Sequence, residues 1–107
     1  MRLERHPAVL ALDLPRIYRF IAQDDPAAAE RVLDAIEQTF EQVVRQPESG
    51  VRYQNQRREL AELRMLPVSG FANYLIFYRI EAGVVRVLYV LHGARNLRQL
   101  FRRERRV

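Results

Sequence analysis

Two side chains that could take part in acid–base or phosphate chemistry stand at the end of the most apolar run of the chain. His92 and Arg95 follow Val84–Leu91 and are separated by Gly93 and Ala94. An imidazole can transfer a proton near neutral pH, and a guanidinium can stabilise charge that develops on a phosphate group. A lone histidine at a strand end is more often a structural hydrogen-bonding group. The pair is therefore compatible both with a chemical site and with a structural role where the chain turns off the sheet edge.

The cationic side chains of this 107-residue chain are all arginine, and they are unevenly placed. Residues 1–50 hold 6 arginines against 9 acidic residues, a net charge of −3, whereas residues 51–107 hold 12 against 4, a net charge of +8. Guanidinium groups bind phosphates and carboxylates through two parallel hydrogen bonds, which an ammonium group cannot do. For any single arginine a solvated side chain is the simpler interpretation, but the asymmetry of the whole chain favours an anionic partner.

The elements that must position these side chains centre on a β-hairpin. Tyr74–Ile80 and Val84–Leu91 are rich in β-branched and aromatic residues, and they flank a three-residue connection over 81–83 that contains a glycine. Such a pair of runs is typical of two antiparallel strands. Glu59–Val68 predicts a third strand, so that three consecutive strands form a meander, and residues 51–58 predict a loop.

Upstream of the hairpin, helical spacing and capping residues predict two helices joined by a short link. Asp25 and Pro26 are a typical N-cap and first helical residue for a helix that continues to about Gln46. An earlier helical segment lies within residues 8–23, with Asp13 as an N-cap; one kinked helix and a turn followed by a helix both fit the sequence. Its predicted buried stripe consists of Leu10, Leu14, Ile17 and Ile21.

Helices followed by strands predict an α+β fold, in which an N-terminal α-helical hairpin packs on a small antiparallel β-sheet. Met1–Arg5 fits a further short strand. Residues 97–107 are a basic tail that predicts either one or two helical turns or a disordered arm. Within the tail, Leu97, Leu100 and Phe101 are spaced to dock one turn against the sheet. At this length, residues 1–107 are predicted to form a single domain.

Several classes of function are disfavoured by residues and patterns that the sequence lacks. The chain has no cysteine, which removes disulfides and thiolate chemistry and suits a cytosolic protein. No apolar run approaches the roughly 20 residues of a membrane-spanning helix, and charged residues near the start interrupt any signal-peptide core. We therefore expect a soluble, cytoplasmic protein with no membrane partner. Metal-ligand spacings and glycine-rich phosphate loops are also missing, so we predict no metal and no cofactor.

Six short segments follow one another at a characteristic spacing: Leu14–Ala22, Asp24–Arg31, Pro47–Gly50, Leu63–Val68, Tyr74–Ile80 and Val90–Arg95. In this order they resemble the RelE/ParE superfamily, the toxins of type II toxin–antitoxin pairs. The resemblance covers nearly the whole chain and is closest to the ParE, or plasmid-stabilisation, branch. It implies a small cytoplasmic toxin that is held inactive by an antitoxin encoded beside it.

The RelE branch cuts messenger RNA on the ribosome, and the resemblance implies which groups such cleavage uses. RelE-like toxins supply lysines, two arginines and a C-terminal tyrosine to activate the 2′-hydroxyl, stabilise the transition state and protonate the leaving oxygen. This chain has no lysine, the positions of one arginine and of the tyrosine hold Leu75 and Phe101, and only Arg95 remains. Related nucleases use His and Glu instead, so His92 beside Arg95 keeps a ribosome-dependent endoribonuclease open as the alternative.

The ParE branch implies a different mechanism, in which the toxin binds DNA gyrase and traps the cleaved DNA complex without catalytic residues of its own. Because the cleavage groups are missing, the sequence favours this branch: a gyrase inhibitor that a cognate antitoxin neutralises. A third alternative is an inactive toxin that only binds its antitoxin. The predicted contacts with gyrase, DNA or antitoxin are Arg64, Arg79, Arg95 and Arg98, although Arg79 and Arg86 equally fit a solvated face of the sheet.

The resemblance also implies how the antitoxin binds. Antitoxins of this class lay an amphipathic helix or an extended segment on the toxin, which uses groove or sheet-edge recognition. A sheet with helices on one face leaves part of the other face or edge for such a segment. Tyr74, Tyr78 and Tyr89 are predicted to line that groove, with core packing as the default for each of them.

Overall fold

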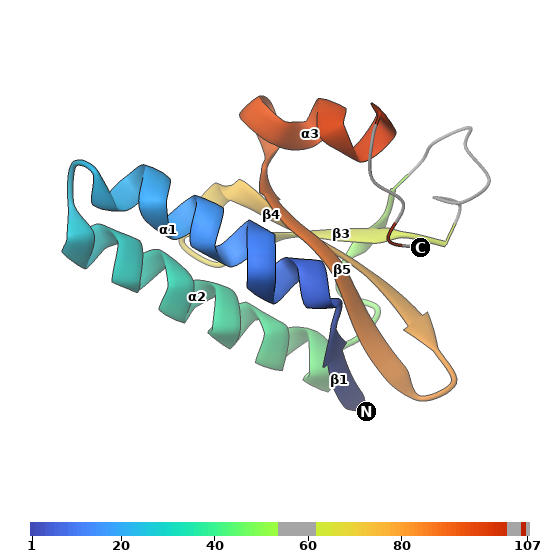
Figure 1. The fold of residues 1–107 in the computed structure, drawn as a ribbon. Coiled ribbons are helices and arrows are strands. Elements are labelled where there is room, and N and C mark those ends of the chain that lie inside the picture. The colour runs from blue at the N-terminus through green and yellow to red at the C-terminus, as the bar shows by residue number, and fades with distance from the viewer. Residues whose placement is uncertain (54–61, 103–105, 107) are drawn as a thin grey trace.

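A computed structural model of the chain describes residues 1–53, 62–102 and 106, with the backbone alone for residues 98–102. Two helices lie on one face of a five-stranded sheet, and a third helix lies at the end of the sheet far from the N-terminus (Figure 1). The predicted α+β fold, a helical hairpin packed on a small sheet, is confirmed. The elements are β1 (Arg2–Arg5), η1 (Val9–Asp13), α1 (Leu14–Ala22), α2 (Pro26–Arg45), β2 (Val51–Arg52), β3 (Arg64–Val68), β4 (Phe71–Glu81), β5 (Val84–His92) and α3 (Gly93–Arg102).

The sheet is mixed, whereas a purely antiparallel sheet was predicted. Its strand order is β1-β5-β4-β3-β2, and β1 runs parallel to β5 while the other neighbours are antiparallel. The predicted meander is present as β3, β4 and β5, and it gains a strand at each edge. The prediction of a loop is wrong for Val51–Arg52, because these residues return beside β3 and pair with Met65 and Arg64. Residues 54–61, which include the rest of that loop and the start of the predicted third strand, lie outside the described residues.

The central hairpin turns through two residues, one fewer than predicted. Glu81 pairs with Val84, so only Ala82 and Gly83 stand between the strands. Both have a positive φ, 48° for Ala82 and 79° for Gly83. Positive φ at both central positions gives a turn whose twist matches that of the two strands. Gly83 adopts this conformation without strain, whereas Ala82 carries a Cβ that disfavours it.

A bulge divides β5 into two halves. Phe77 pairs with Tyr89 and Tyr78 pairs with Val87, so Leu88 has no partner on β4. The extra residue lets Leu88 and Tyr89 both contribute to the apolar cluster on the face away from α1 and α2. We call 84–87, next to the hairpin turn, the lower half of β5, and 88–92 the upper half.

The first helical segment is one continuous helix that begins with a π-helical turn, which settles the alternative that the sequence left open. η1 runs into α1 without a break. The wider turn buries Val9, Asp13 and Ile17 at intervals of four residues. Leu10 is therefore 54% exposed and does not belong to the buried stripe in which it was predicted. The remaining residues of that stripe pack against the core as expected: Leu14, Ile17 and Ile21.

Asp13 does not cap α1 through its side chain, contrary to the prediction, because its carboxylate has partners from distant segments. It accepts a hydrogen bond from the Val90 N–H (3.0 Å) and forms a buried, two-pronged ion pair with Arg106 (Nη1–Oδ2 2.5 Å, Nη2–Oδ1 3.0 Å). Arg106 Nη1 also donates to the Leu88 carbonyl (3.1 Å). Since β1 pairs only with the lower half of β5, Asp13 and Arg106 take the place of a strand beside the upper half.

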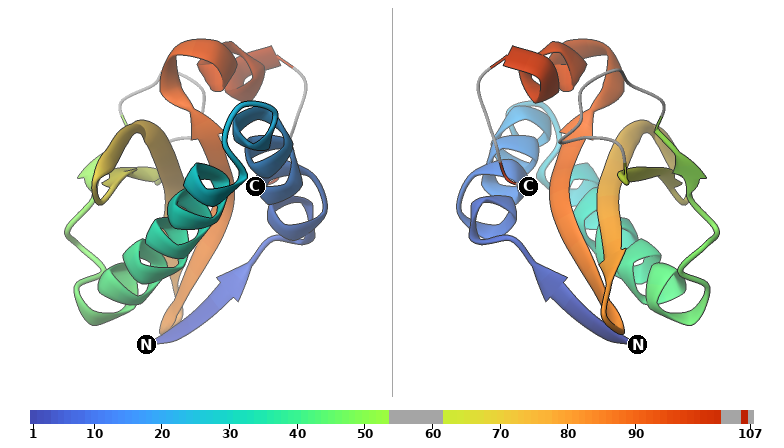
Figure 2. Two further views of the ribbon diagram at one scale, coloured as in Figure 1. Left: turned by 90° about the vertical axis from the view of Figure 1, so that its left-hand side faces the viewer. Right: turned by 90° about the vertical axis from the view of Figure 1, so that its right-hand side faces the viewer.

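α2 begins as predicted and contributes more buried residues than the rest of the helical layer. The Asp25 carboxylate accepts the Ala28 N–H (3.1 Å), and Pro26 is the first helical residue. Figure 2 shows α1 and α2 together on one face of the sheet. The core between the helices and the sheet includes, from α2, Val32, Ala35, Ile36, Phe40 and Val43, and, from β4 and β5, Tyr74, Ile76, Tyr78, Val85, Val87 and Val90.

Candidate binding surface at the sheet-to-helix junction

His92 ends β5 and acts as the N-cap of α3. Its Nδ1 accepts the backbone N–H of Arg95 (3.2 Å), the third residue of the helix, which is the bond that a capping side chain makes. The ring also meets Tyr74 edge-on, with the ring centroids 5.2 Å apart. His92 therefore has the structural hydrogen-bonding role that is the more common one for a histidine at a strand end.

The electrostatics of the junction keep His92 neutral. Burial lowers the pKa of the imidazole below its ordinary value, and the nearby Arg95 charge lowers it further. The hydrogen bond to Nδ1 acts in the same direction, because a protonated imidazole has no lone pair to accept it. With Nδ1 engaged in the cap, only Nε2 is left for other partners.

Arg95 is held by two aromatic residues. Its Nη2 donates to the Tyr74 hydroxyl (3.3 Å), and its guanidinium lies 3.7 Å from the centroid of the Phe20 ring. The stack fixes the plane of the guanidinium, and the residue remains exposed. Phe20 was absent from the predicted site. The signal that could have found it is its position off the Leu14–Ile17–Ile21 stripe, which places this large aromatic side chain on the polar side of α1.

Arg64 and Tyr78 stabilise the segment that follows α2 instead of forming part of this surface. Arg64 Nη1 donates to the Gly50 carbonyl (2.8 Å). The Tyr78 hydroxyl donates to the Pro47 carbonyl (2.6 Å) and accepts the Gly50 N–H (2.8 Å), and the ring is fully buried. A Cβ at Gly50 would lie 2.5 Å from the Tyr78 hydroxyl oxygen, so this close approach requires glycine.

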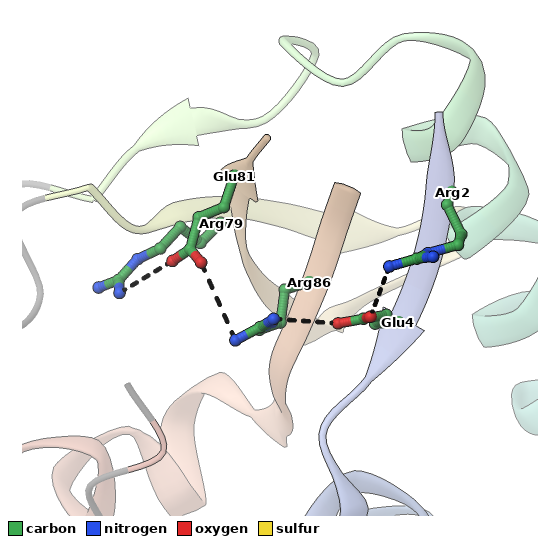
Figure 3. A network of polar contacts seen from close by, with 5 residues as sticks. All are labelled: Arg2, Glu4, Arg79, Glu81 and Arg86. Atoms are coloured by element: carbon green, nitrogen blue, oxygen red, sulfur yellow. Dashed lines mark hydrogen bonds and ion pairs between the residues drawn. The ribbon is translucent and has the colours of Figure 1, made fainter. Parts of the chain in front are cut away.

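Arg79 belongs to a chain of alternating charges on the lower part of the sheet (Figure 3). We call this set, Arg2, Glu4, Arg86, Glu81 and Arg79, the charge ladder. Neighbouring members are 3.0 Å apart at Arg2–Glu4, 3.1 Å at Glu4–Arg86, 3.9 Å at Arg86–Glu81 and 3.4 Å at Glu81–Arg79. Strand alternation places these residues on the face opposite the helices, since Leu3, Ile80 and Val85 between them face the core.

The remaining predicted contacts are placed as follows. Tyr89 is buried, packs edge-on against Phe77 and lies under the guanidinium of Arg106 (4.6 Å), so it belongs to the apolar cluster of the helix-free face. Leu97 packs against that cluster, which agrees with the prediction that it docks against the sheet. Arg98 lies in α3, but its side chain is outside the described part of the structure, as are those of Leu100 and Phe101.

The structure thus brings together only part of the predicted set. Arg95, Tyr74 and His92 form one cluster, whereas Arg64 and Tyr78 hold the segment after α2, Arg79 lies in the charge ladder and Tyr89 is in a core. The roles of these residues in binding stay predictions. Within residues 1–53, 62–102 and 106, no group of three His, Asp or Glu side chains could hold a metal ion. In the same part of the chain, no helix is long and apolar enough to cross a membrane.

Comparison with known proteins identifies the family. A family model described as the ParE toxin of the type II toxin-antitoxin system parDE matches residues 5–97. This chain belongs to the ParE toxin family. The resemblance to the ParE branch of the RelE/ParE superfamily is thereby confirmed. The ParE match includes the His92–Arg95 junction and ends within α3, so Arg106 lies beyond it.

A solved structure supports the same fold. The chain resembles the "Chromosomal ParDE TA system from P. aeruginosa" with a TM-score of 0.68 and 16% sequence identity, over 86% of this chain and 95% of that chain. At this identity the likeness concerns the fold of the ParE family and not the residues of a site. No curated protein sequence matches the chain.

Proposed function

We propose that this ParE-family chain is a toxin that acts by binding DNA gyrase and that a cognate antitoxin neutralises it. Family membership supports the general class, a toxin of a type II toxin–antitoxin system. The finer statement, gyrase as the target, follows from what the ParE branch implies. Gyrase acts on the chromosome, so the proposal also places the protein in the cytoplasm and requires no cofactor.

The observation that carries a binding mechanism is the use of His92 and Arg95 in the junction. His92 gives its Nδ1 to the helix cap, and Arg95 is stacked on Phe20 and bonded to Tyr74. Both residues have a structural task that fixes where an exposed guanidinium is presented. A positioned arginine beside aromatic rings is typical of residues that dominate protein interfaces.

A supercoiling assay with purified gyrase tests the proposal. We expect the protein to stop supercoiling and to raise the amount of cleaved DNA in the gyrase complex, and we expect R95A to weaken both effects. The antitoxin, added in equimolar amount, should restore supercoiling. Unchanged supercoiling with no added cleavage, at toxin concentrations well above that of gyrase, would refute gyrase as the target.

A second candidate function is a ribosome-dependent endoribonuclease that uses His92 and Arg95. The observation in its favour is the pKa of His92, which lies below its ordinary value and so keeps a neutral imidazole beside a guanidinium at neutral pH. Primer extension on ribosome-bound message distinguishes the two candidates. Discrete cuts that disappear in H92A and R95A would establish cleavage. An inactive toxin would instead leave growth unchanged when it is expressed without antitoxin.

A further inference from the structure

The first strand leaves its outer edge without a neighbouring strand. β1 stands at one end of the order β1-β5-β4-β3-β2 and pairs only with the lower half of β5. In both views of Figure 2 it lies at the margin of the ribbon, and no other strand of the described residues lies beyond it. The backbone groups along such an edge can pair with a strand from another molecule.

The hydrogen bonds toward β5 show which backbone groups of β1 point outward. The N–H groups of Arg2 and His6 donate to carbonyls of the β4–β5 hairpin, at 3.2 Å and 2.8 Å. Because the backbone groups of successive residues point to opposite sides of a strand, those of Leu3 and Arg5 point away from the sheet. These two residues therefore present the donors and acceptors that a further strand requires.

The side chains of β1 form a charge pattern that is complementary to itself. Arg2 and Glu4 lie on the face opposite the helices, whereas Leu3 between them packs against the core. When two copies of β1 run antiparallel about a two-fold axis at Leu3, Arg2 of each copy lies opposite Glu4 of the other. The two Leu3 residues then exchange their outward backbone hydrogen bonds, and their side chains meet.

Other registers of the same two strands are disfavoured. A two-fold axis at Arg2 or at Glu4 would place like charges opposite one another, which destabilises a strand pair. An axis at Arg5 would place Leu3 opposite Pro7 of the second copy, and a proline has no N–H to donate. The residues of the edge thus select the register that is centred on Leu3.

We propose that two copies of this chain associate through the outer edge of β1 and form one continuous sheet across a two-fold axis. The inference goes beyond the proposed function, because it requires neither gyrase nor an antitoxin. A nucleic acid fits this edge less well, since Glu4 lies between Arg2 and Arg86, at 3.0 Å and 3.1 Å. A second copy supplies both the extended backbone and the matching order of charges.

The antiparallel arrangement also determines the strength and shape of the dimer. β1 leads into η1 at its C-terminal end, so the first helical segments of the two copies lie at opposite ends of the paired strands. β1 has only 4 residues, which makes the contact smaller than a permanent interface and the dimer a weak one. Backbone hydrogen bonds supply the affinity, and the charges fix the register, because Arg2 and Glu4 already contact each other within one copy.

Sedimentation equilibrium with the full-length protein, at concentrations up to about 1 mM, tests the proposal. We expect the wild type to dimerise reversibly. R2E and E4R each place like charges opposite one another twice per dimer, so each should raise the dissociation constant by about 10-fold or more. An equimolar mixture of R2E and E4R should dimerise again, since two acidic residues of one copy then face two arginines of the other.

Two control variants separate this edge from other effects of charge. R52E reverses an exposed arginine on β2, the strand at the opposite edge of the sheet. R86A removes the contact with Glu4 within one copy but leaves the charges of β1 unchanged. Both should stay within about 2-fold of the wild type, because exposed charges away from the contact have little effect.

Each outcome supports or overturns the dimer independently of the toxin's target. A wild type that remains monomeric throughout would overturn it, and loss of the dimer in R52E alone would assign association to the opposite edge. A mixture that fails to dimerise, while the wild type does, would overturn the register centred on Leu3. The side chain of Arg2 is 71% exposed, so R2E, checked by circular dichroism, keeps the test decisive even where E4R disturbs the fold.

Discussion

The two halves of β5 satisfy their hydrogen bonds and charges in different ways. The lower half lies between two strands, β1 and β4, and the charged residues on its open face belong to a ladder in which each arginine meets a glutamate. Among the described residues, the upper half has a strand, β4, on one side only. Its other edge is closed by the side chains of Asp13 and Arg106, and it leads into a helix whose first exposed cation, Arg95, faces aromatic rings.

This difference separates the scaffold from the surface for which we propose a binding role. Charges that neutralise one another within the chain have little left to offer a partner, so the lower half acts as a support for the hairpin. At the upper half, the chain places a positive charge where no carboxylate of the described residues meets it, and it uses two aromatic side chains to hold that charge in one plane. A charge that is positioned but not neutralised is what a docking surface requires.

The largest expected effect comes from opening the edge of the upper half. D13A removes the carboxylate that pairs with the buried Arg106 guanidinium and accepts the Val90 N–H. Loss of one partner of a buried ion pair costs about 3–5 kcal/mol. The free energy of unfolding, measured with urea, should fall by this amount. D34N on the exposed face of α2 is the control, and equal values for the two variants would show that the pair does not close the edge.

A smaller loss is expected on β4 beside the lower half of β5, where Tyr78 contacts the segment after α2. Y78F keeps the buried ring but removes the hydroxyl that bonds Pro47 and Gly50. The buried Gly50 N–H and the partly buried Pro47 carbonyl then lose this partner, so the free energy of unfolding should fall by about 1–3 kcal/mol. Gyrase and antitoxin binding by the folded protein should be unchanged. A loss of binding without a loss of stability would place Tyr78 in the binding surface and break the division between the halves.

The cap at the end of the upper half should contribute less. H92A removes the acceptor for the Arg95 N–H, and loss of an N-cap costs about 1 kcal/mol of unfolding free energy. H92N, which keeps a capping acceptor, should recover most of it at neutral pH. If H92A is as stable as the wild type, then α3 does not depend on this cap.

The same histidine predicts how stability depends on pH. Burial, and secondly the Arg95 charge, lower the pKa of His92 in the folded protein, so protonation is harder there than in the unfolded chain. Its contribution is therefore complete above the ordinary value of 6.5 and is lost as the pH falls below it. Urea unfolding at pH 7.5 and pH 5 should show a decline that is shallower in H92N. An equal decline in both proteins would assign the pH dependence to other groups.

The smallest effect is expected in the charge ladder. R86A breaks contacts with Glu4 and Glu81, but these side chains are partly exposed and screened by water. Exposed ion pairs contribute at most about 1 kcal/mol, and less at high salt. The thermal midpoint of R86A should approach that of the wild type as NaCl is raised. A loss comparable to that of D13A would mean that the ladder, too, is an essential part of the fold.

Elements with local signals were predictable from the sequence. Asp25 and Pro26 mark the start of α2 because a cap and a first-turn proline act on neighbouring residues. The β4–β5 hairpin follows from two apolar runs around Gly83 in the same way. The contact of Leu97 with the sheet was predictable for the same reason, because Leu97 lies only a few residues after the end of β5.

Features that depend on distant partners were not predictable in this way. Asp13 has the sequence context of an N-cap, yet its partners are Val90 and Arg106, and a buried counter-ion outweighs a local capping bond. The parallel pairing of β1 with β5 joins residues about 80 positions apart, which no local pattern encodes. Phe20 joins the site only because α3 returns to α1, so its contact with Arg95 required the fold.

The sequence separation of the Asp13–Arg106 pair also determines when the fold can be completed. The two residues are 93 positions apart, so at typical elongation rates Arg106 is synthesised about 5–20 s after Asp13. During that interval the helical hairpin can form, but the edge of β5 cannot yet be closed. The edge of β5 can therefore be closed in this way only after Arg106 has left the ribosome.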